Sequence, residues 1–188
     1  MAKSKNISGP KYHQRDKSTE KYLDKDIIIK ALNIRPGQII LDAGCGNGYM
    51  AKEFAAQLEG RGKVYALDPD EISIETLLLQ TKGTVIEPFV GDITKQTKLK
   101  NSSIDLIYLS TVFHGFSENQ AAGFLKEVKR LLKTKGKLAV LEIEKQETPF
   151  GPPLEIRFSP EELKEIITLK PADLVNVGQY FYMQIFEN

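Results

Sequence analysis

Ile39 to Gly48 read IILDAGCGNG, and this stretch decides the fold. Three apolar residues run into Asp42, which is typical of a buried strand that ends at a turn. Glycines follow at alternate positions, 44, 46 and 48. Because glycine has no Cβ, such a turn can adopt positive φ and let a ligand lie against bare backbone. Helical spacing resumes directly afterwards, so the predicted order is strand, glycine turn and helix.

The spacing of Gly44, Gly46 and Gly48 distinguishes between two kinds of ligand. The fingerprint of dinucleotide-binding proteins is G-x-G-x-x-G, and its late glycine allows close packing of helix against strand. Here the third glycine comes one residue early, and Tyr49 takes the late position. Asp42, two residues before the first glycine, also suits a ligand with a positive amino group better than a pyrophosphate. The run resembles the first motif of the class I S-adenosylmethionine-dependent methyltransferases, acid-x-Gly-x-Gly-x-Gly.

The rest of the chain alternates apolar strands with amphipathic helices. The strands expected after the first are Val64–Asp68, Thr84–Val90, Ile104–Leu109 and Lys137–Ile143. The expected helices are Tyr22–Leu32, Tyr49–Leu58, Ile72–Leu78, Ser117–Leu132 (ended by Lys135-Gly136) and one that starts at Ser159. Two more strands, 174–179 and 180–186, are expected to form an antiparallel pair. This alternation predicts an α/β fold with a doubly wound, mostly parallel seven-stranded sheet and helices on both faces.

The resemblance covers about residues 38–143 and implies S-adenosyl-L-methionine as the cofactor. In a doubly wound sheet, ligands lie at the carboxyl ends of the strands, and several polar residues of this sequence fall there. The cofactor-binding residues that the resemblance implies are Asp42, Gly44, Gly46, Gly48, Asp68, Pro69, Asp92, Ile93, Leu109 and Ser110.

The roles of these residues follow the family's pattern. Asp68 would accept hydrogen bonds from the ribose hydroxyls, beside the apolar surface of Pro69. Asp92 would bind the adenine amino group, with Ile93 packed on the ring, and the backbone carbonyls of residues 109–110 would line the cofactor. From the residues alone, Asp68 could instead be a helix N-cap and Asp92 part of an ordinary turn.

His114 is the candidate general base, because it follows the fourth expected strand and imidazole exchanges protons near neutral pH. The alternative is a packing or capping histidine at a helix start. Glu142 and Glu144 end the fifth strand on one face, where solvated strand-end acids are expected. Arg157 is a candidate substrate residue for a carboxylate or phosphate, or else a surface ion-pair partner. Cys45 is small enough for the glycine turn, and we assign it no nucleophilic role.

Composition and charge set limits on these interpretations. The 188 residues suit one domain, and contents of 41% hydrophobic and 27% charged residues are ordinary for a soluble protein. No apolar run approaches the ~20 residues of a membrane span, and no secretory signal is recognisable, so we expect a cytoplasmic protein. One cysteine and no acidic cluster indicate no metal site. We expect a basic arm over 1–17, an N-terminal helix within 18–35 and a lid-like insertion over 144–160.

The predicted activity is transfer of a methyl group from S-adenosylmethionine to an oxygen, nitrogen or sulfur of a small-molecule acceptor. A small domain with one lid-sized insertion favours such an acceptor. Two alternatives stay open: an RNA or protein methyltransferase that uses the basic arm, and a non-catalytic nucleotide-binding subunit. A nicotinamide oxidoreductase comes last, because the glycine spacing disfavours it.

Overall fold

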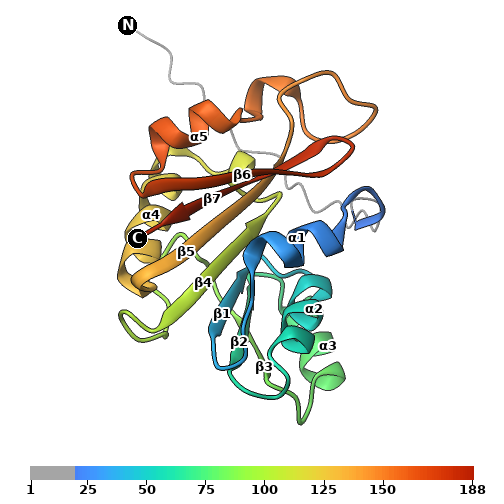
Figure 1. The fold of residues 1–188 in the computed structure, drawn as a ribbon, viewed down its shortest axis with the longest axis vertical. Helices are drawn as coiled ribbons and strands as arrows, with labels where there is room; N and C mark the ends of the chain where they lie inside the picture. The colour runs from blue at the N-terminus through green and yellow to red at the C-terminus, as the bar shows by residue number, and fades with distance from the viewer. Residues whose placement is uncertain (1–19) are drawn as a thin grey trace, which may run out of the picture.

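The computed structural model describes residues 20–188, and a seven-stranded sheet in the order β3-β2-β1-β4-β5-β7-β6 lies at its centre (Figure 1). The strands are β1 (Ile39–Ala43), β2 (Lys63–Asp68), β3 (Ile86–Val90), β4 (Ile104–Ser110), β5 (Leu132–Ile143), β6 (Lys170–Gly178) and β7 (Phe181–Glu187). β1 to β5 pair in parallel, whereas β7 runs antiparallel to both of its neighbours, β5 and β6. The predicted fold class is therefore confirmed.

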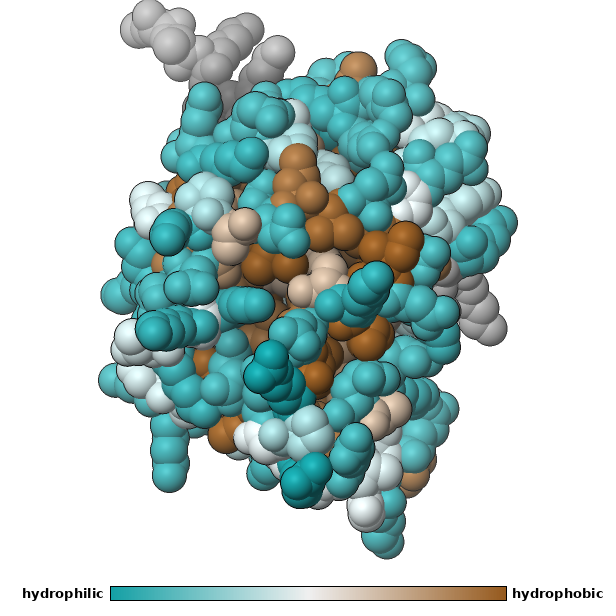
Figure 2. Space-filling model, viewed as in Figure 1, coloured by the Kyte–Doolittle hydropathy of each residue, from teal (hydrophilic) through white to brown (hydrophobic). Residues whose placement is uncertain are grey.

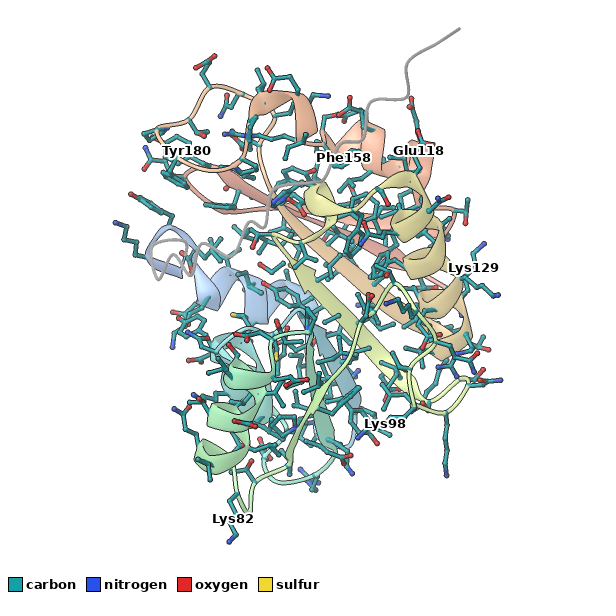
Figure 3. The ribbon with its side chains drawn as sticks, turned by 180° about the vertical axis from the view of Figure 1, so that it is seen from behind. Lys82, Lys98, Glu118, Lys129, Phe158 and Tyr180 are labelled. Carbon is teal, nitrogen blue, oxygen red and sulfur yellow. The ribbon has the colours of Figure 1, made fainter. Side chains whose placement is uncertain are left out.

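Helices cover both faces of this sheet (Figure 1). They are α1 (Lys25–Leu32), α2 (Tyr49–Gln57), α3 (Glu71–Gln80), α4 (Glu118–Leu131) and α5 (Pro160–Ile166), with short 3-10 helices η1 (Glu20–Tyr22), η2 (Phe113–Gly115) and η3 (Leu154–Ile156). One apolar core packs α1, α2 and α3 against one face, and a second packs α4 and α5 against the other. In Figure 3, which shows the molecule from behind, side chains fill the space between the sheet and α4.

The two cores follow from the side-chain alternation of each strand. Ile40 belongs to the core under α1 to α3, and its neighbour Leu41 belongs to the core under α4 and α5. Because successive strand residues point to opposite faces, a strand buried on both sides reads as a continuous apolar run. Figure 2 shows apolar side chains gathered at the centre of the outer surface on the α1 side, surrounded by hydrophilic ones.

Local capping explains where the helices begin. Ser117 and Gln120 form a capping box at the start of α4, and Ser159 and Glu162 form another at the start of α5. The helix expected over Tyr22–Leu32 is in fact η1 followed by α1. The carboxylate of Asp24 separates them, because it accepts hydrogen bonds from the backbone amides of residues 26 and 27 and so caps α1.

The predicted end of α4 at Leu132 lies one residue past the observed end, but the prediction that Lys135-Gly136 stops the helix and that the next strand starts at Lys137 is wrong. The helix ends at Leu131, and β5 begins at the next residue. Leu132 pairs with Ile104, and the next pair is Lys137 with Leu106, so the chain between them bulges out of the ladder. Lys135 adopts φ 64° within this bulge. The segment with Lys135 and Gly136 therefore forms an irregularity within β5 and is not the end of a helix.

Some expectations fall where the structure gives no test. The basic arm, residues 1–17, lies outside the described residues, and the division of the chain into arm, helix and insertion stays a prediction. Among the helices of residues 20–188, none combines the length and apolar character that crossing a bilayer demands. Within the same residues, no group of three or more His, Cys, Asp or Glu side chains could hold a metal ion.

Candidate cofactor and catalytic site

The glycine turn lies at the carboxyl ends of β1 and β2, beside the point where the strand order reverses between β1 and β4. Gly44, Gly46 and Gly48 all have positive φ, at 77°, 51° and 75°. The backbone amides of Gly44 and Cys45 donate to the carbonyl of Leu67 at 2.7 and 3.0 Å, which fastens the turn to β2. The left-handed conformation explains why glycines occupy these positions.

The three glycines face different surroundings. A Cβ on Gly44 would lie 2.7 Å from Val112 Cγ2, and one on Gly48 would lie 2.4 Å from Leu77 Cδ1. A Cβ on Gly46 would meet nothing within 4 Å. Gly44 and Gly48 therefore permit close packing inside the protein, whereas Gly46 leaves open space on the side where a ligand could approach.

Asp42 is the carboxylic acid of this site whose pKa departs most from its usual value. Its side chain is buried, at 3% exposure, and its Oδ2 has no hydrogen-bond partner within the described residues. Burial, reinforced by the charge of Asp68, raises the pKa of Asp42 to about 7, although a backbone hydrogen bond from Ala51 opposes the shift. A buried carboxylate with a free oxygen suits the cationic group of a ligand.

Asp68 is joined directly to the glycine turn. Its Oδ2 accepts a hydrogen bond from the backbone amide of Gly46 at 2.9 Å, and its Oδ1 accepts one from Asp70 at 2.8 Å. A carboxylate offers about four lone-pair sites, so both oxygens keep capacity for ligand hydroxyls. The N-cap residue of α3 is Asp70, so the reading of Asp68 as the cap is wrong. Pro69, between the two acids, is exposed.

Asp92 and Ile93 are engaged within the protein itself. Asp92 Oδ1 accepts hydrogen bonds from the Thr94 backbone amide (2.9 Å) and hydroxyl (2.6 Å), and its Oδ2 pairs with Lys95 at 3.0 Å. Burial alone would raise the pKa of Asp92, but the hydrogen bonds from Thr94 and Lys95 hold it below its usual value. Ile93 is buried in the core under α4 and α5. Turn chemistry is thus present, and the adenine-binding roles stay predictions.

The end of β4 lies against the glycine turn. Leu109 is fully buried, so only its backbone could face a ligand, and Ser110 is half-buried. Thr111 follows with φ 55°, an uncommon conformation for a β-branched residue. Val112 then packs against Gly44, as its close approach to the Gly44 Cβ position indicates. The segment that leads to His114 is therefore fixed beside the turn expected to hold the cofactor.

His114 and Glu142 form a polar pair between η2 and β5. Nδ1 of His114 lies 2.7 Å from Glu142 Oε2, and the backbone amide of His114 donates to Oε1 at 3.4 Å. Glu142 is 1% exposed. The expectation of a solvated strand-end acid is therefore wrong for Glu142. The burial of Glu142 could have been predicted from the strand pattern, because Leu138 and Val140 lie on the same strand face and belong to the buried core.

The interpretation of Arg157 as a substrate residue is also wrong. Its side chain is buried, and its guanidinium donates to four backbone carbonyls, those of residues 144, 146, 150 and 152, at 2.8 to 3.2 Å. These bonds use most of its five N–H donors. Arg157 thus holds the segment between β5 and η3 in place, and it forms neither the anion site nor the surface ion pair that its sequence context suggested.

Cys45 is buried within the glycine turn. Burial, with the nearby charges of Asp42 and Asp68, raises the pKa of the thiol far above its usual range. Because the thiolate is the reactive form, this environment disfavours reactivity. The absence of a nucleophilic role for Cys45 stays a prediction, which the burial of its thiol supports.

Comparisons with known proteins agree with this geometry. A family described as methyltransferase domain matches residues 40–136, just over half of the chain. The ubiquinone/menaquinone biosynthesis C-methyltransferase UbiE of Cupriavidus metallidurans is 32% identical over 123 residues, which cover 64% of this chain and 49% of that protein. The protein of the same name from Laribacter hongkongensis is 28% identical over 130 residues, or 68% of this chain and 52% of that one. The chain spans about half the length of the curated relatives it matches.

A solved structure extends the likeness beyond the matched segment. The crystal structure of a SAM-dependent methyltransferase from Aquifex aeolicus has a TM-score of 0.81 and 26% identity, over 92% of this chain and 93% of that chain. The open space at Gly46 and the free oxygen of Asp42 fit the cofactor that such enzymes use. The chain belongs to the methyltransferase domain family and is an S-adenosylmethionine-dependent methyltransferase of class I.

Proposed function

We propose that this enzyme methylates a small molecule whose reacting atom carries a proton, and that His114, oriented by Glu142, removes that proton. The contact of 2.7 Å between His114 Nδ1 and the buried carboxylate of Glu142 carries the proposal. Glu142 would keep a proton on Nδ1, so that Nε2 is free to accept another. Nε2 forms no hydrogen bond to a residue within 20–188.

The cofactor supplies an electrophilic methyl group on a sulfonium, and the protein's part is to align the nucleophile and to manage its proton. We propose that the cofactor lies over Gly46, with Asp42 toward its amino group and Asp68 toward its ribose. Two facts support this: Gly46 is open on one side, and Asp68 binds its backbone amide. Pro69, Asp92, Ile93, Leu109 and Ser110 are proposed as the remaining cofactor contacts.

A general base is needed only for some methyl acceptors. A hydroxyl or a protonated amine must lose a proton around the time of transfer, whereas a thioether has none to lose. We therefore favour a methyl acceptor that reacts through an O–H or N–H group over one whose reacting atom carries no proton. The relatives named C-methyltransferases extend the set to a carbon that bears hydrogen, because such a carbon must lose its own proton once the methyl group has been added.

A small acceptor is supported by the segment that follows β5. Residues 144–156 come directly after Glu142 and its strand, and Arg157 fixes them through bonds to their carbonyls. Phe158 continues this segment and packs its ring against Phe113, with ring centroids 5.2 Å apart, next to His114. A preformed wall beside the candidate base suits a ligand that is enclosed rather than a long polymer.

The test is methyl transfer from radiolabelled S-adenosylmethionine to a panel of phenols, hydroquinones, amines and thiols. Once an acceptor is found, we expect His114→Ala to lower the rate by about a hundredfold while affinity for S-adenosylhomocysteine stays the same. Glu142→Gln should lower the rate less and change the shape of the pH–rate profile. Glu118→Gln is the matched control, because Glu118 is an exposed acid four residues from His114 in the chain, at the start of α4, and does not contact it.

The proposal fails if His114→Ala and Glu118→Gln have equal rates. It also fails if the favoured acceptor has no proton at its reacting atom. In the first case His114 would be a packing residue, and in the second the enzyme would act by alignment alone.

A further inference from the structure

We propose that Thr111 is a positioning residue whose left-handed backbone forms a rigid elbow between the glycine turn and His114. The inference rests on the role proposed for His114 and extends it to a residue outside every motif of the sequence. The elbow consists of residues 110–112, where the chain leaves β4 and turns toward η2.

The conformation of Thr111 is unusual within residues 20–188. Its φ is 55°, and the other residues besides glycine with positive φ are Asn33, Glu59, Ser102 and Lys135. Those four are exposed and unbranched at Cβ, whereas Thr111 is half-buried and β-branched. In the left-handed region Cβ lies too close to the following carbonyl oxygen, and branching at Cβ adds to the crowding. Such strain persists only where the surrounding structure enforces it, and it gathers at functional sites.

Hydrogen bonds of the backbone and of the side chain hold this conformation. The backbone amide of Thr111 donates to the carbonyl of Leu141 at 2.8 Å, so the ladder between β4 and β5 reaches one residue past Ser110. The hydroxyl of Thr111 donates to the carbonyl of Ser110 at 2.8 Å. Leu141 directly precedes Glu142, so the elbow is attached to β5 next to the residue that binds His114.

The elbow connects the two halves of the candidate site. On one side Val112 packs on the glycine turn, with its Cγ2 2.7 Å from the position of a Cβ on Gly44. On the other side His114 contacts Glu142 through its backbone amide at 3.4 Å and through Nδ1 at 2.7 Å. Because Thr111 lies between these contacts, its φ determines where the imidazole lies relative to the turn expected to hold the cofactor.

The choice of threonine over glycine at this turn has a physical consequence. Glycine would adopt the same φ without strain, but it would also leave the elbow free to move. The branched side chain and its hydrogen bond restrict Thr111 to one conformation. A displacement of about 1 Å in a reacting group can lower a rate about a hundredfold. We therefore interpret the strain as the means by which the chain keeps His114 aligned with the methyl group of the cofactor.

The test compares Thr111→Gly with Thr111→Asn. Glycine relieves the strain and loosens the elbow, whereas asparagine has a Cβ and tolerates the left-handed region. With the acceptor found in the panel above, we expect Thr111→Gly to lower the methyl-transfer rate about tenfold and Thr111→Asn to keep it within about threefold of the parent rate. Both variants should stay folded and bind S-adenosylhomocysteine within about twofold of the parent affinity by calorimetric titration.

A second measurement needs no acceptor. Nitrogen-15 NMR of histidine-labelled protein, at a pH where imidazole is neutral, shows which ring nitrogen carries the proton. The His114→Ala variant identifies the His114 signals among those of the two histidines. The contact with Glu142 should hold the parent and Thr111→Asn in the tautomer protonated at Nδ1. Thr111→Gly should show a mixture of tautomers, because the imidazole can then leave the carboxylate.

Glu59→Gly is the matched control. Glu59 also has a left-handed backbone, at φ 49°, but it follows the C-terminal end of α2, whereas the glycine turn precedes the N-terminal end of that helix. The same kind of substitution there should leave both the transfer rate and the His114 tautomer unchanged.

Three results would overturn the proposal. If Thr111→Gly keeps the parent rate and a single tautomer, Thr111 forms a local turn only. If affinity for S-adenosylhomocysteine falls as far as the rate, the elbow supports the cofactor site and not His114. If Thr111→Asn loses as much activity as Thr111→Gly, the threonine side chain matters rather than the backbone conformation.

Failure of the proposed function would give a different result. A His114→Ala variant with the parent rate would exclude His114 as the base, yet a mixture of tautomers in Thr111→Gly would still support the elbow.

Discussion

Gly46 and Gly48 belong to one turn and both have positive φ, yet their surroundings predict opposite outcomes of substitution. Gly48→Ala would drive a methyl group into Leu77, so we expect a loss of about 2–3 kcal/mol in the free energy of unfolding. Gly46→Ala adds a methyl group in open space and should cost only about 1 kcal/mol for the left-handed backbone. Its loss should instead be in affinity for S-adenosylhomocysteine, by tenfold or more.

Urea unfolding and calorimetric titration on both variants separate the two effects. If Gly46→Ala binds S-adenosylhomocysteine as well as the parent, the ligand does not lie over the turn. A folded, stable Gly48→Ala variant would show that Leu77 can move aside at little cost.

At the same scale, the sequence predicted residue types better than it predicted partners. The glycine turn and Asp42 could be assigned because their chemistry depends on neighbours in the chain. The roles of Glu142 and Arg157 could not be assigned, because their partners come from other parts of the chain. The partner of Glu142 is His114, 28 residues away, and Arg157 binds backbone carbonyls between residues 144 and 152. A buried acid in a strand has the same local sequence as an exposed one until the strand's place in the sheet is known.

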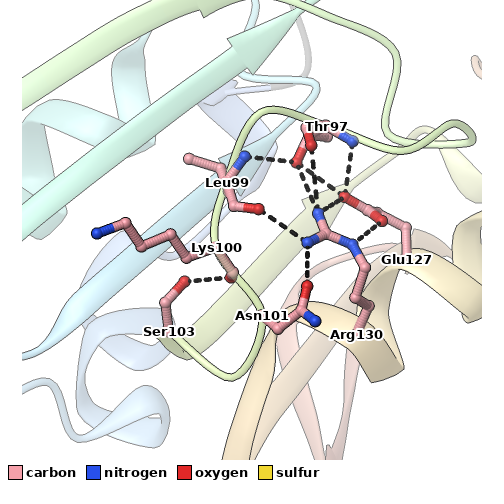
Figure 4. Close-up of polar contacts among 7 residues, drawn as sticks. All are labelled: Thr97, Leu99, Lys100, Asn101, Ser103, Glu127 and Arg130. Atoms are coloured by element: carbon pink, nitrogen blue, oxygen red, sulfur yellow. Dashed lines mark hydrogen bonds and ion pairs between the residues drawn. The ribbon is translucent and has the colours of Figure 1, made fainter.

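At the scale of elements, one ion-pair network attaches a loop to α4 (Figure 4). Arg130 donates to Glu127 Oε2 at 2.7 Å, to the Leu99 carbonyl at 2.8 Å and to Asn101 Oδ1 at 2.6 Å. Oε1 of the buried Glu127 also accepts from the backbone amide and hydroxyl of Thr97, both at 2.8 Å. The network fixes the chain between β3 and β4, which begins at the candidate site.

This network predicts a pH-dependent stability. Although burial opposes it, hydrogen bonds from Arg130 and Thr97 hold the pKa of Glu127 below its usual value of 4.5. Stability from a lowered acid pKa is present above the unfolded value and is lost as pH falls through the folded value. We therefore expect Glu127→Gln to cost about 2 kcal/mol of unfolding free energy at pH 7 and much less at pH 3.

Urea unfolding at the two pH values provides the measurement, with Glu59→Gln as control. Glu59 pairs with Arg61 on the surface, where such pairs contribute little, so this variant should match the parent at both pH values. Equal destabilisation of Glu127→Gln at pH 7 and pH 3 would mean that the lost contact is not ionic.

The elements themselves were largely predictable, and the misplaced boundary has a physical cause. Ser117 and Ser159 mark helix starts through capping boxes that a sequence displays directly. The start of β5 was missed because Leu132 joins the sheet before the bulge that contains Lys135 and Gly136. A bulge is defined by the partner strand, so the chain that forms it carries only a weak signal of its own.

At the scale of the whole molecule, ligand binding should appear as global stabilisation. S-adenosylhomocysteine at 100 times its dissociation constant adds about 2.7 kcal/mol, which corresponds to a rise of roughly 5–10 °C in melting temperature. NAD at the same concentration should cause no shift, because the glycine spacing and Asp42 disfavour a pyrophosphate. Differential scanning calorimetry decides the matter, and a shift with NAD alone would contradict our assignment of the glycine turn.

The strand order also affects how the chain is made. Synthesis delivers β6 before β7, but in the finished sheet β6 pairs with β7, which lies between β5 and β6. Until β7 emerges, β5 and β6 both present unpaired backbone groups to other nascent chains. Pro171 and the two register irregularities of β6 make that strand a poor template for foreign pairing. The bulges and the proline therefore protect the chain most during synthesis, before the sheet is closed.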